Sequence, residues 1–170
     1  MEKMNKVMSL LACAAIVTLG AVTANAQLTD GGFETTGLPN WTAFNSAFQL
    51  AYAGAHGGTH VMQVYGPFNS NWDGAGAYQT IPASPGQSWL LTGYALNPSG
   101  DAMQGTSFGL IQLVFKDSGS NGIGTDSSAN FGAGSPTDVW TTLTASGVAP
   151  AGTVAVSVYT LHLSTPANSG

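Results

Sequence analysis

Residues 30–34 have the composition of a cation-binding turn. Gly31 and Gly32 separate Asp30 from the ring of Phe33 and the carboxylate of Glu34. A glycine turn presents bare carbonyl oxygens beside a carboxylate, and Ca²⁺ prefers several oxygen ligands of this kind. We therefore predict that Glu34 binds calcium rather than taking part in catalysis. The alternative is a surface carboxylate on an entry turn, and we expect Asp30 to serve the turn itself.

Aromatic rings and amides form the second group of candidates, because the C–H face of a pyranose packs on a π-face. Trp72 lies in a polar loop, where a large ring has no evident core to enter. Trp72 is therefore the strongest candidate for ligand contact, and Trp41, Tyr78 and Gln112 complete the set. For Trp41, as for the other tryptophans inside predicted strands, core packing is the alternative.

Residue patterns for metal-dependent or nucleophilic catalysis are missing from the sequence. His56 and His60 have a spacing that would share one face of a helix, but Gly57-Gly58 between them predicts a turn. The sequence contains no Gly-x-Ser-x-Gly, no phosphate-binding loop with Lys and no His-Glu-x-x-His. Its aspartates lie in or beside turns, where solvated carboxylates are expected rather than a hydrolytic pair. We predict that the protein is not an enzyme.

Residues 1–26 have the pattern of a secretory signal peptide. Lysines precede an apolar run over residues 7–22, which ends in Ala24-Asn25-Ala26. The run is shorter than the ~20 residues of a membrane span, and no second apolar run follows. We expect a secreted protein of a bacterial cell envelope or exterior, without a membrane span.

The chain after residue 26 is acidic and poor in charge. It holds one basic residue, Lys116, against seven acidic residues, and the only cysteine, Cys13, lies in the predicted signal. Nucleic acid and anionic lipid are poor partners for such a surface, because binding phosphates requires clustered Lys or Arg. Disulfides are excluded from the mature domain. We expect a monomer with a neutral polar surface, which hydrogen-bonds readily to neutral sugars.

Hydrophobic residues after the signal alternate with period two, between clusters of Gly, Pro, Asn and Ser. This pattern predicts an all-β fold, a two-sheet antiparallel β-sandwich, in one domain over residues 27–170. The expected strands are 40–53, 59–65, 75–81, 87–96, 107–115, 138–145 and 153–163.

Several motifs occur in an order that resembles the jelly rolls of the CBM4/9/22-like, galactose-binding-like carbohydrate-binding modules. The resemblance covers nearly all of the chain after the signal. The motifs are Gly32-Phe33-Glu34, Trp41, Ala55-His56-Gly57-Gly58-Thr59, Tyr78-Gln79-Thr80-Ile81, Pro85-Gly86-Gln87-Ser88-Trp89, Phe115-Lys116-Asp117, Trp140 and Ala149-Pro150-Ala151-Gly152-Thr153.

The resemblance implies a structural calcium site at Gly32, Glu34 and Thr59. The chain departs from the group at its end, where members have a strand with an Asp-Asp-Val-like run and this sequence has Ala167-Asn168-Ser169-Gly170. Either the domain is truncated at its C-terminus, with an unpaired strand edge and one calcium ligand fewer, or another segment closes the sheet.

Two functions of different classes follow. The first is a non-catalytic carbohydrate-binding module that recognises neutral polysaccharide. The second is a cell-surface or matrix sandwich that mediates protein contacts or adhesion without binding sugar. An exposed row of aromatic rings in a groove would favour the first, and a smooth polar face over buried tryptophans would favour the second.

Overall fold

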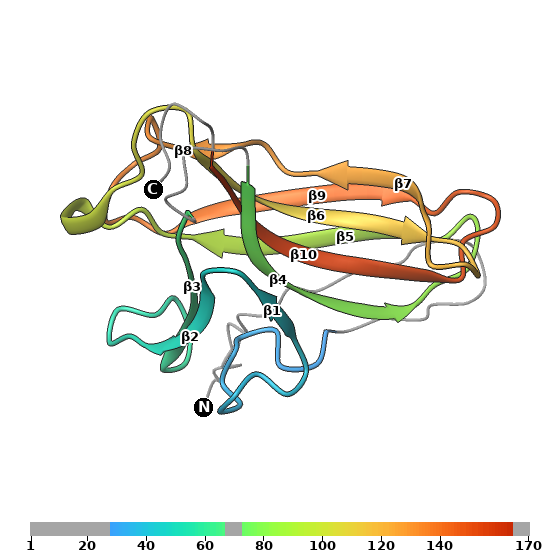
Figure 1. Cartoon of the computed structure of the whole chain (residues 1–170), viewed down its shortest axis with the longest axis horizontal. Helices are drawn as coiled ribbons and strands as arrows, with labels where there is room; N and C mark the ends of the chain where they lie inside the picture. The colour runs from blue at the N-terminus through green and yellow to red at the C-terminus, as the bar shows by residue number, and fades with distance from the viewer. Residues whose placement is uncertain (1–27, 67–72, 165–170) are drawn as a thin grey trace, which may run out of the picture.

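The computed structural model describes residues 28–66 and 73–164, which form an antiparallel β-sandwich (Figure 1). The one helical turn of these residues is the 3₁₀ turn η1 (Ser99–Asp101). The strands are β1 (Thr42–Phe44), β2 (Ala47–Ala51), β3 (His60–Val64), β4 (Asp73–Pro82), β5 (Ser88–Ala95), β6 (Phe108–Lys116), β7 (Gly122–Ser127), β8 (Phe131–Gly132), β9 (Thr141–Val148) and β10 (Ala155–Ser164).

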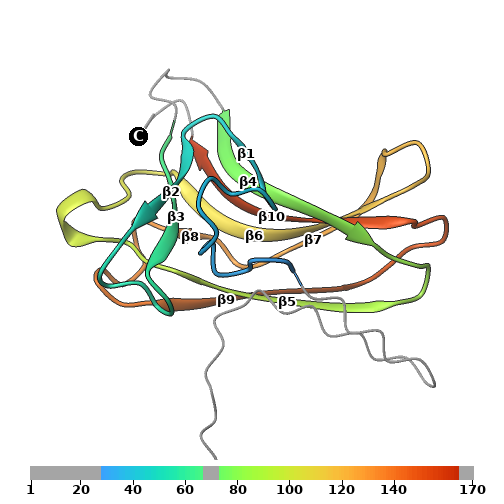
Figure 2. The same cartoon turned by 90° about the horizontal axis from the view of Figure 1, so that it is seen from below.

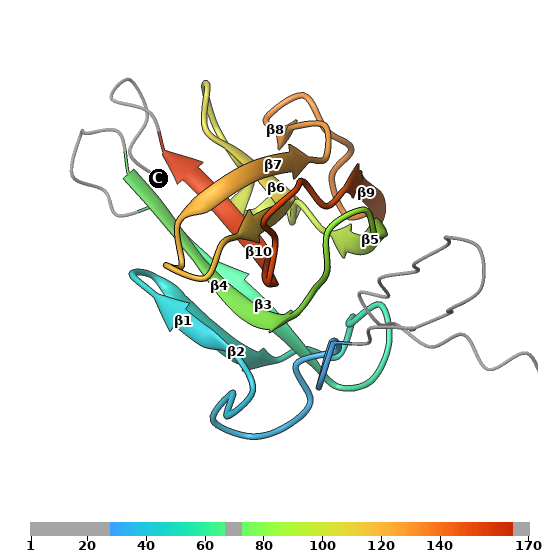
Figure 3. The ribbon, with the colours of Figure 1, turned by 90° about the vertical axis from the view of Figure 1, so that its right-hand side faces the viewer.

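The strands are arranged in one large sheet and two pairs. The large sheet has the order β1-β4-β10-β6-β7, and β8 also pairs with β6. The β5–β9 pair lies across the core from β4, β10 and β6 (Figure 2). Seen along the long axis, the β2–β3 hairpin and the β5–β9 pair lie on different sides of the molecule (Figure 3). No described strand joins β3 to β5.

Alternation along the strands builds the core. In β10, Val156 and Val158 are buried and lie opposite Phe115 and Leu113 of β6. From the facing pair, β5 contributes Trp89 and Leu91, and β9 contributes Leu143 and Ala145. Side chains from both layers therefore interdigitate in one core, as expected for stacked sheets.

The predicted fold class is confirmed, and eight of the ten strands match the expected segments closely or in part. The segment 40–53 is divided into β1 and β2 because Asn45 has a φ of 52° and turns the chain. Strands β7 and β8 were not predicted. The sequence of β7, Gly-Ile-Gly-Thr-Asp-Ser, has too little hydrophobic alternation to distinguish it from a loop.

Three predictions concern residues outside the described ranges: the signal peptide over residues 1–26, the candidate ligand contact Trp72 and the departure from the group at residues 167–170. Within the described ranges, none of the helical structure reaches the length and apolar character needed to cross a membrane.

Candidate functional site

The turn at residues 30–34 is closed by its own side chains. The carboxylate of Asp30 accepts hydrogen bonds from the backbone N–H groups of Glu34 (2.7 Å) and Thr35 (3.0 Å), which confirms the predicted turn role of Asp30. Its carbonyl accepts a bond from the backbone N–H of Phe33 at 3.0 Å. The closed turn directs the Glu34 side chain toward the start of β3.

The carboxylate of Glu34 joins this turn to β3, and we call the contact the Glu34 clamp (Glu34, Gly58, Thr59 and His60). It accepts bonds from the backbone N–H groups of Thr59 and His60, both at 3.0 Å, and from the Thr59 hydroxyl at 2.9 Å. His60 Nδ1 lies 3.2 Å from Glu34 Oε2. Gly58 has a φ of +76°, and a Cβ there would overlap the carboxylate, so a larger residue would strain the backbone and displace the Glu34 side chain.

These donors determine the charge state of Glu34. Desolvation acts to raise the pKa of Glu34, but the hydrogen bonds from His60 and Thr59 outweigh it and lower the pKa to about 2. Glu34 is therefore ionised throughout the physiological pH range.

The clamp presents the wrong groups for calcium as it stands. Calcium takes six to eight oxygen ligands, whereas Thr59 and His60 turn N–H and O–H donors toward Glu34. The described residues contain no group of three or more His, Cys, Asp or Glu side chains that could hold a metal. A calcium site at Gly32, Glu34 and Thr59 stays a prediction, and it requires these donors to be exchanged for carbonyl oxygens.

Trp41 lies in the core rather than at a ligand surface. Its side chain is 6% exposed, and its indole N–H donates to the Asp30 carbonyl at 2.9 Å. Its ring centroid lies 4.8 Å from that of Phe33. Because this packing covers the ring, the structure favours the alternative of core packing, and Trp41 is not retained as a ligand contact.

Tyr78 and Gln112 lie on the same face of the large sheet, separated by Tyr159 of β10. Tyr159 is the register partner of both residues. The rings of Tyr78 and Tyr159 are 5.1 Å apart, and Gln112 Nε2 donates to the Ser127 hydroxyl at 2.9 Å. The structure therefore brings these two predicted contacts onto one surface, the tyrosine face (Tyr78, Gln112 and Tyr159).

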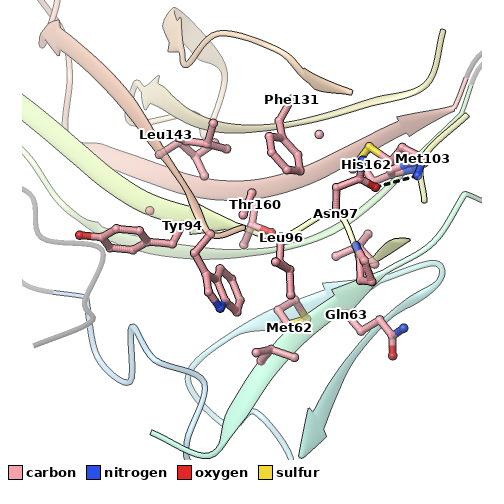
Figure 4. Close-up of a pocket in the computed structure, with 18 of the residues that line it drawn as sticks. Met62, Gln63, Tyr94, Leu96, Asn97, Met103, Phe131, Leu143, Thr160 and His162 are labelled. Carbon is pink, nitrogen blue, oxygen red and sulfur yellow. Dashed lines mark hydrogen bonds between the residues drawn. The ribbon is translucent and has the colours of Figure 1, made fainter. Parts of the chain in front are cut away.

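A cleft of about 510 Å³ lies between β3 and β5. Consecutive residues line it on both sides, 60–66 and 93–98, so both strands turn a backbone edge toward it. Among the described strands, β3 pairs with β2 and β5 pairs with β9, which leaves these facing edges unpaired. The floor includes Phe131 and Leu143 (Figure 4).

Aromatic side chains from three distant segments meet at the cleft, and we call them the aromatic rim (His56, Tyr94 and Trp140). The ring of His56 stacks on Tyr94, with centroids 3.8 Å apart and planes at 19°. Trp140 packs edge-on against His56 at 5.7 Å, and its indole N–H donates to the Gly54 carbonyl at 2.9 Å. Tyr94 remains 36% exposed.

This rim was not predicted from the sequence. Trp140 was expected inside a strand, where core packing is the rule, whereas β9 begins one residue later and Trp140 is half-buried at the cleft. Asp138, with a φ of 59°, turns the chain just before it. No local pattern links His56, Tyr94 and Trp140, because only the folded sandwich brings them together.

The opposite end of the cleft is polar. Asn97 and His162 line it and are 1% and 4% exposed. Among the described residues, neither Asn97 Nδ2 nor His162 Nδ1 has a hydrogen-bond partner. Burial lowers the pKa of His162, so its imidazole is neutral at neutral pH.

Comparison with known proteins identifies the fold. No family model matches the chain, and no curated protein matches it. Among solved structures, the C-terminal family 22 carbohydrate-binding module of Xyn10B from Clostridium thermocellum matches with a TM-score of 0.52 and 18% identity, over 79% of this chain and 82% of the module. The enzymatically active domain of tailspike protein 4 from bacteriophage CBA120 matches with a TM-score of 0.49 and 17% identity, over 78% of this chain and 18% of that domain.

The likeness to the family 22 module, at this identity, concerns the fold. The chain has the β-sandwich fold of that module, which confirms the jelly-roll resemblance drawn from the sequence motifs. In the module, residues of a cleft act in ligand binding.

Proposed function

We propose that this chain is a non-catalytic carbohydrate-binding β-sandwich that takes a neutral glycan into the cleft between β3 and β5. The observation that carries the proposal is the aromatic rim beside a cleft of about 510 Å³. Tyr94 and Trp140 offer ring surface for the C–H face of a pyranose, and the unpaired strand edges offer backbone donors and acceptors. The shared fold with a carbohydrate-binding module supports the same function.

Charge in the cleft favours a neutral ligand. Asp101 is the one carboxylate among the described lining residues, which include no lysine or arginine. An acidic polysaccharide would find no cationic partner there, and glycoside hydrolysis through the usual pair of carboxylates would lack its second group. Binding without catalysis is therefore the function that the lining supports.

The predicted signal peptide supports an extracellular location, and we propose a secreted module that binds extracellular polysaccharide. Calcium at Glu34 is a separate proposal with its own test, because the proposed glycan contacts do not depend on it.

A protein-contact function is the second candidate, and one observation favours it. Phe48 and Leu50 of β2 are 43% and 37% exposed on the hairpin. Phe48 packs against Tyr65 at 5.9 Å and extends this apolar surface. Exposed apolar side chains beside an unpaired strand edge suit association with another protein surface.

The direct test is retention of the protein on immobilised neutral and acidic polysaccharides, with calcium and with chelator. We expect saturable retention on a neutral polysaccharide, lost in Tyr94→Ala and kept in Tyr78→Ala. The second variant is a matched control, because it removes a tyrosine from the tyrosine face. Loss of retention in Tyr78→Ala alone would move the site to that face. A folded protein retained on no polysaccharide would favour the protein-contact function.

A further inference from the structure

The polar end of the cleft combines two buried side chains from different sheets. Asn97 follows β5, and His162 belongs to β10. Figure 4 shows both at the end of the pocket away from Tyr94. They are 1% and 4% exposed, yet Asn97 Nδ2 and His162 Nδ1 have no partner among the described residues. A buried polar atom without a partner is costly and calls for a specific explanation.

The side chain of Asn97 is held in one orientation. The backbone N–H of Met103 donates to Asn97 Oδ1 at 2.8 Å, and the Asn97 carbonyl accepts from the backbone N–H of Asp138 at 3.0 Å. With the amide oxygen engaged, the amide nitrogen of this cleft-lining residue is a donor of fixed orientation.

His162 supplies the complementary atom. Its Nδ1 accepts a hydrogen bond when the imidazole proton is on Nε2, and neutral imidazole provides one acceptor nitrogen. The two residues that carry this donor and this acceptor line the same end of the pocket. A carboxylate ligand could not donate to Nδ1, and it would have to bury its charge without a cationic partner.

We propose that Asn97 and His162 form a hydroxyl-binding subsite, in which one glycan hydroxyl accepts from Asn97 Nδ2 and donates to His162 Nδ1. A hydroxyl satisfies both atoms because it is a neutral donor and acceptor in a single group. This inference rests on the proposed glycan function and assigns its polar anchor, while the aromatic rim supplies the stacking surface.

The chain offers a matched control on the same strand. Ser164 of β10 is fully buried, and its hydroxyl also has no partner among the described residues, but Ser164 does not line the cleft. Removing this hydroxyl measures how much an unpartnered polar atom on β10 lowers the stability of the fold. Removing the His162 ring nitrogens tests the same cost together with the loss of the subsite.

The experiment is titration calorimetry of cellohexaose, xylohexaose and mannohexaose into the wild-type chain, His162→Phe, His162→Gln and Ser164→Ala, with a melting curve for each. For the hexaose that binds, we expect His162→Phe to weaken affinity about tenfold, the effect of one or two neutral hydrogen bonds. His162→Gln should keep most of the affinity, and Ser164→Ala all of it. Neither His162→Phe nor Ser164→Ala should lower the melting temperature.

Three outcomes would overturn the subsite. Equal affinity of wild type and His162→Phe would show that the polar pair holds only water, while the glycan function stands. No binding of any hexaose by the folded wild type would refute the glycan function and the subsite together. Slow amide exchange at the facing edges of β3 and β5 without sugar would show that a peptide strand occupies the cleft.

Discussion

The Glu34 clamp and the cleft meet at β3, but they differ in whether their polar groups have hydrogen-bond partners. In the clamp, the carboxylate accepts hydrogen bonds from the backbone and hydroxyl groups around it. In the cleft, Asn97 Nδ2 and His162 Nδ1 are buried without partners among the described residues. His60 belongs to both regions, since it contacts Glu34 and lines the cleft. A satisfied network holds the fold together, whereas unsatisfied buried groups leave hydrogen-bonding capacity for a ligand.

The largest effect in this comparison is expected from Gly58→Ala. Gly58 has a φ of +76°, and a Cβ there would overlap the Glu34 carboxylate. Backbone strain and loss of the clamp together should lower the free energy of unfolding by about 3 kcal/mol, measured by denaturant titration. Gly37→Ala is the control, because Gly37 has a φ of +83° with open space at its Cβ. It should cost about 1 kcal/mol, and equal losses would contradict the clamp.

Glu34→Gln should have the next largest effect. The amide keeps the shape of the side chain but loses the charge and turns an N–H toward donors of Thr59 or His60. Because Glu34 is 39% exposed, screening reduces the cost, and we expect a loss of about 2 kcal/mol in unfolding free energy. If Glu34→Gln has the same unfolding free energy as the wild type in chelator, the hydrogen bonds to the Glu34 carboxylate do not contribute to stability.

The stability that the Glu34 clamp contributes should depend on pH. The pKa of Glu34 falls from 4.5 to about 2 on folding, so the clamp contributes its full stability above about pH 4.5. This contribution should decrease as the pH falls from 4.5 toward 2. The stability difference between wild type and Glu34→Gln, followed by chemical denaturation over this range, isolates it from the other acidic groups. A difference that stays constant down to pH 2 would refute the low pKa.

Calcium should have the smallest effect on the clamp. Because donors already surround the Glu34 carboxylate, we expect most of the loss in Glu34→Ala to persist in chelator. If the predicted site forms, calcium raises the melting temperature of the wild type and leaves Glu34→Ala unchanged. An identical response of both proteins would exclude Glu34 as a ligand.

The strands could be predicted from the sequence where apolar and polar residues alternate strongly. The run from Val154 to Tyr159 predicted β10 because its apolar side chains alternate and fill the core. Strand β7 was missed because it lies at the edge of the large sheet and pairs through backbone groups, with Gly122 and Gly124 in its sequence. Hydrophobic periodicity reports burial, and an edge strand can form without it.

The candidate site was largely hidden from the sequence. The family resemblance assigned Glu34 and Thr59 to one site, and the structure brings the two residues into contact, while calcium at that site stays a prediction. Asn97, Tyr94 and His162 have none, because they reach the cleft from different strands and connections. Whether one of these residues lacks a hydrogen-bond partner depends on how the other residues pack around it in the folded chain.

The most direct test of glycan binding in the cleft is a map of amide NMR shifts on titration with the hexaose that binds most tightly. Binding in the cleft predicts shifts at residues 93–98, along the facing edge of β3 and at His162, with Tyr78, Gln112 and Tyr159 unchanged. Shifts confined to the tyrosine face, with the cleft unperturbed, would contradict it.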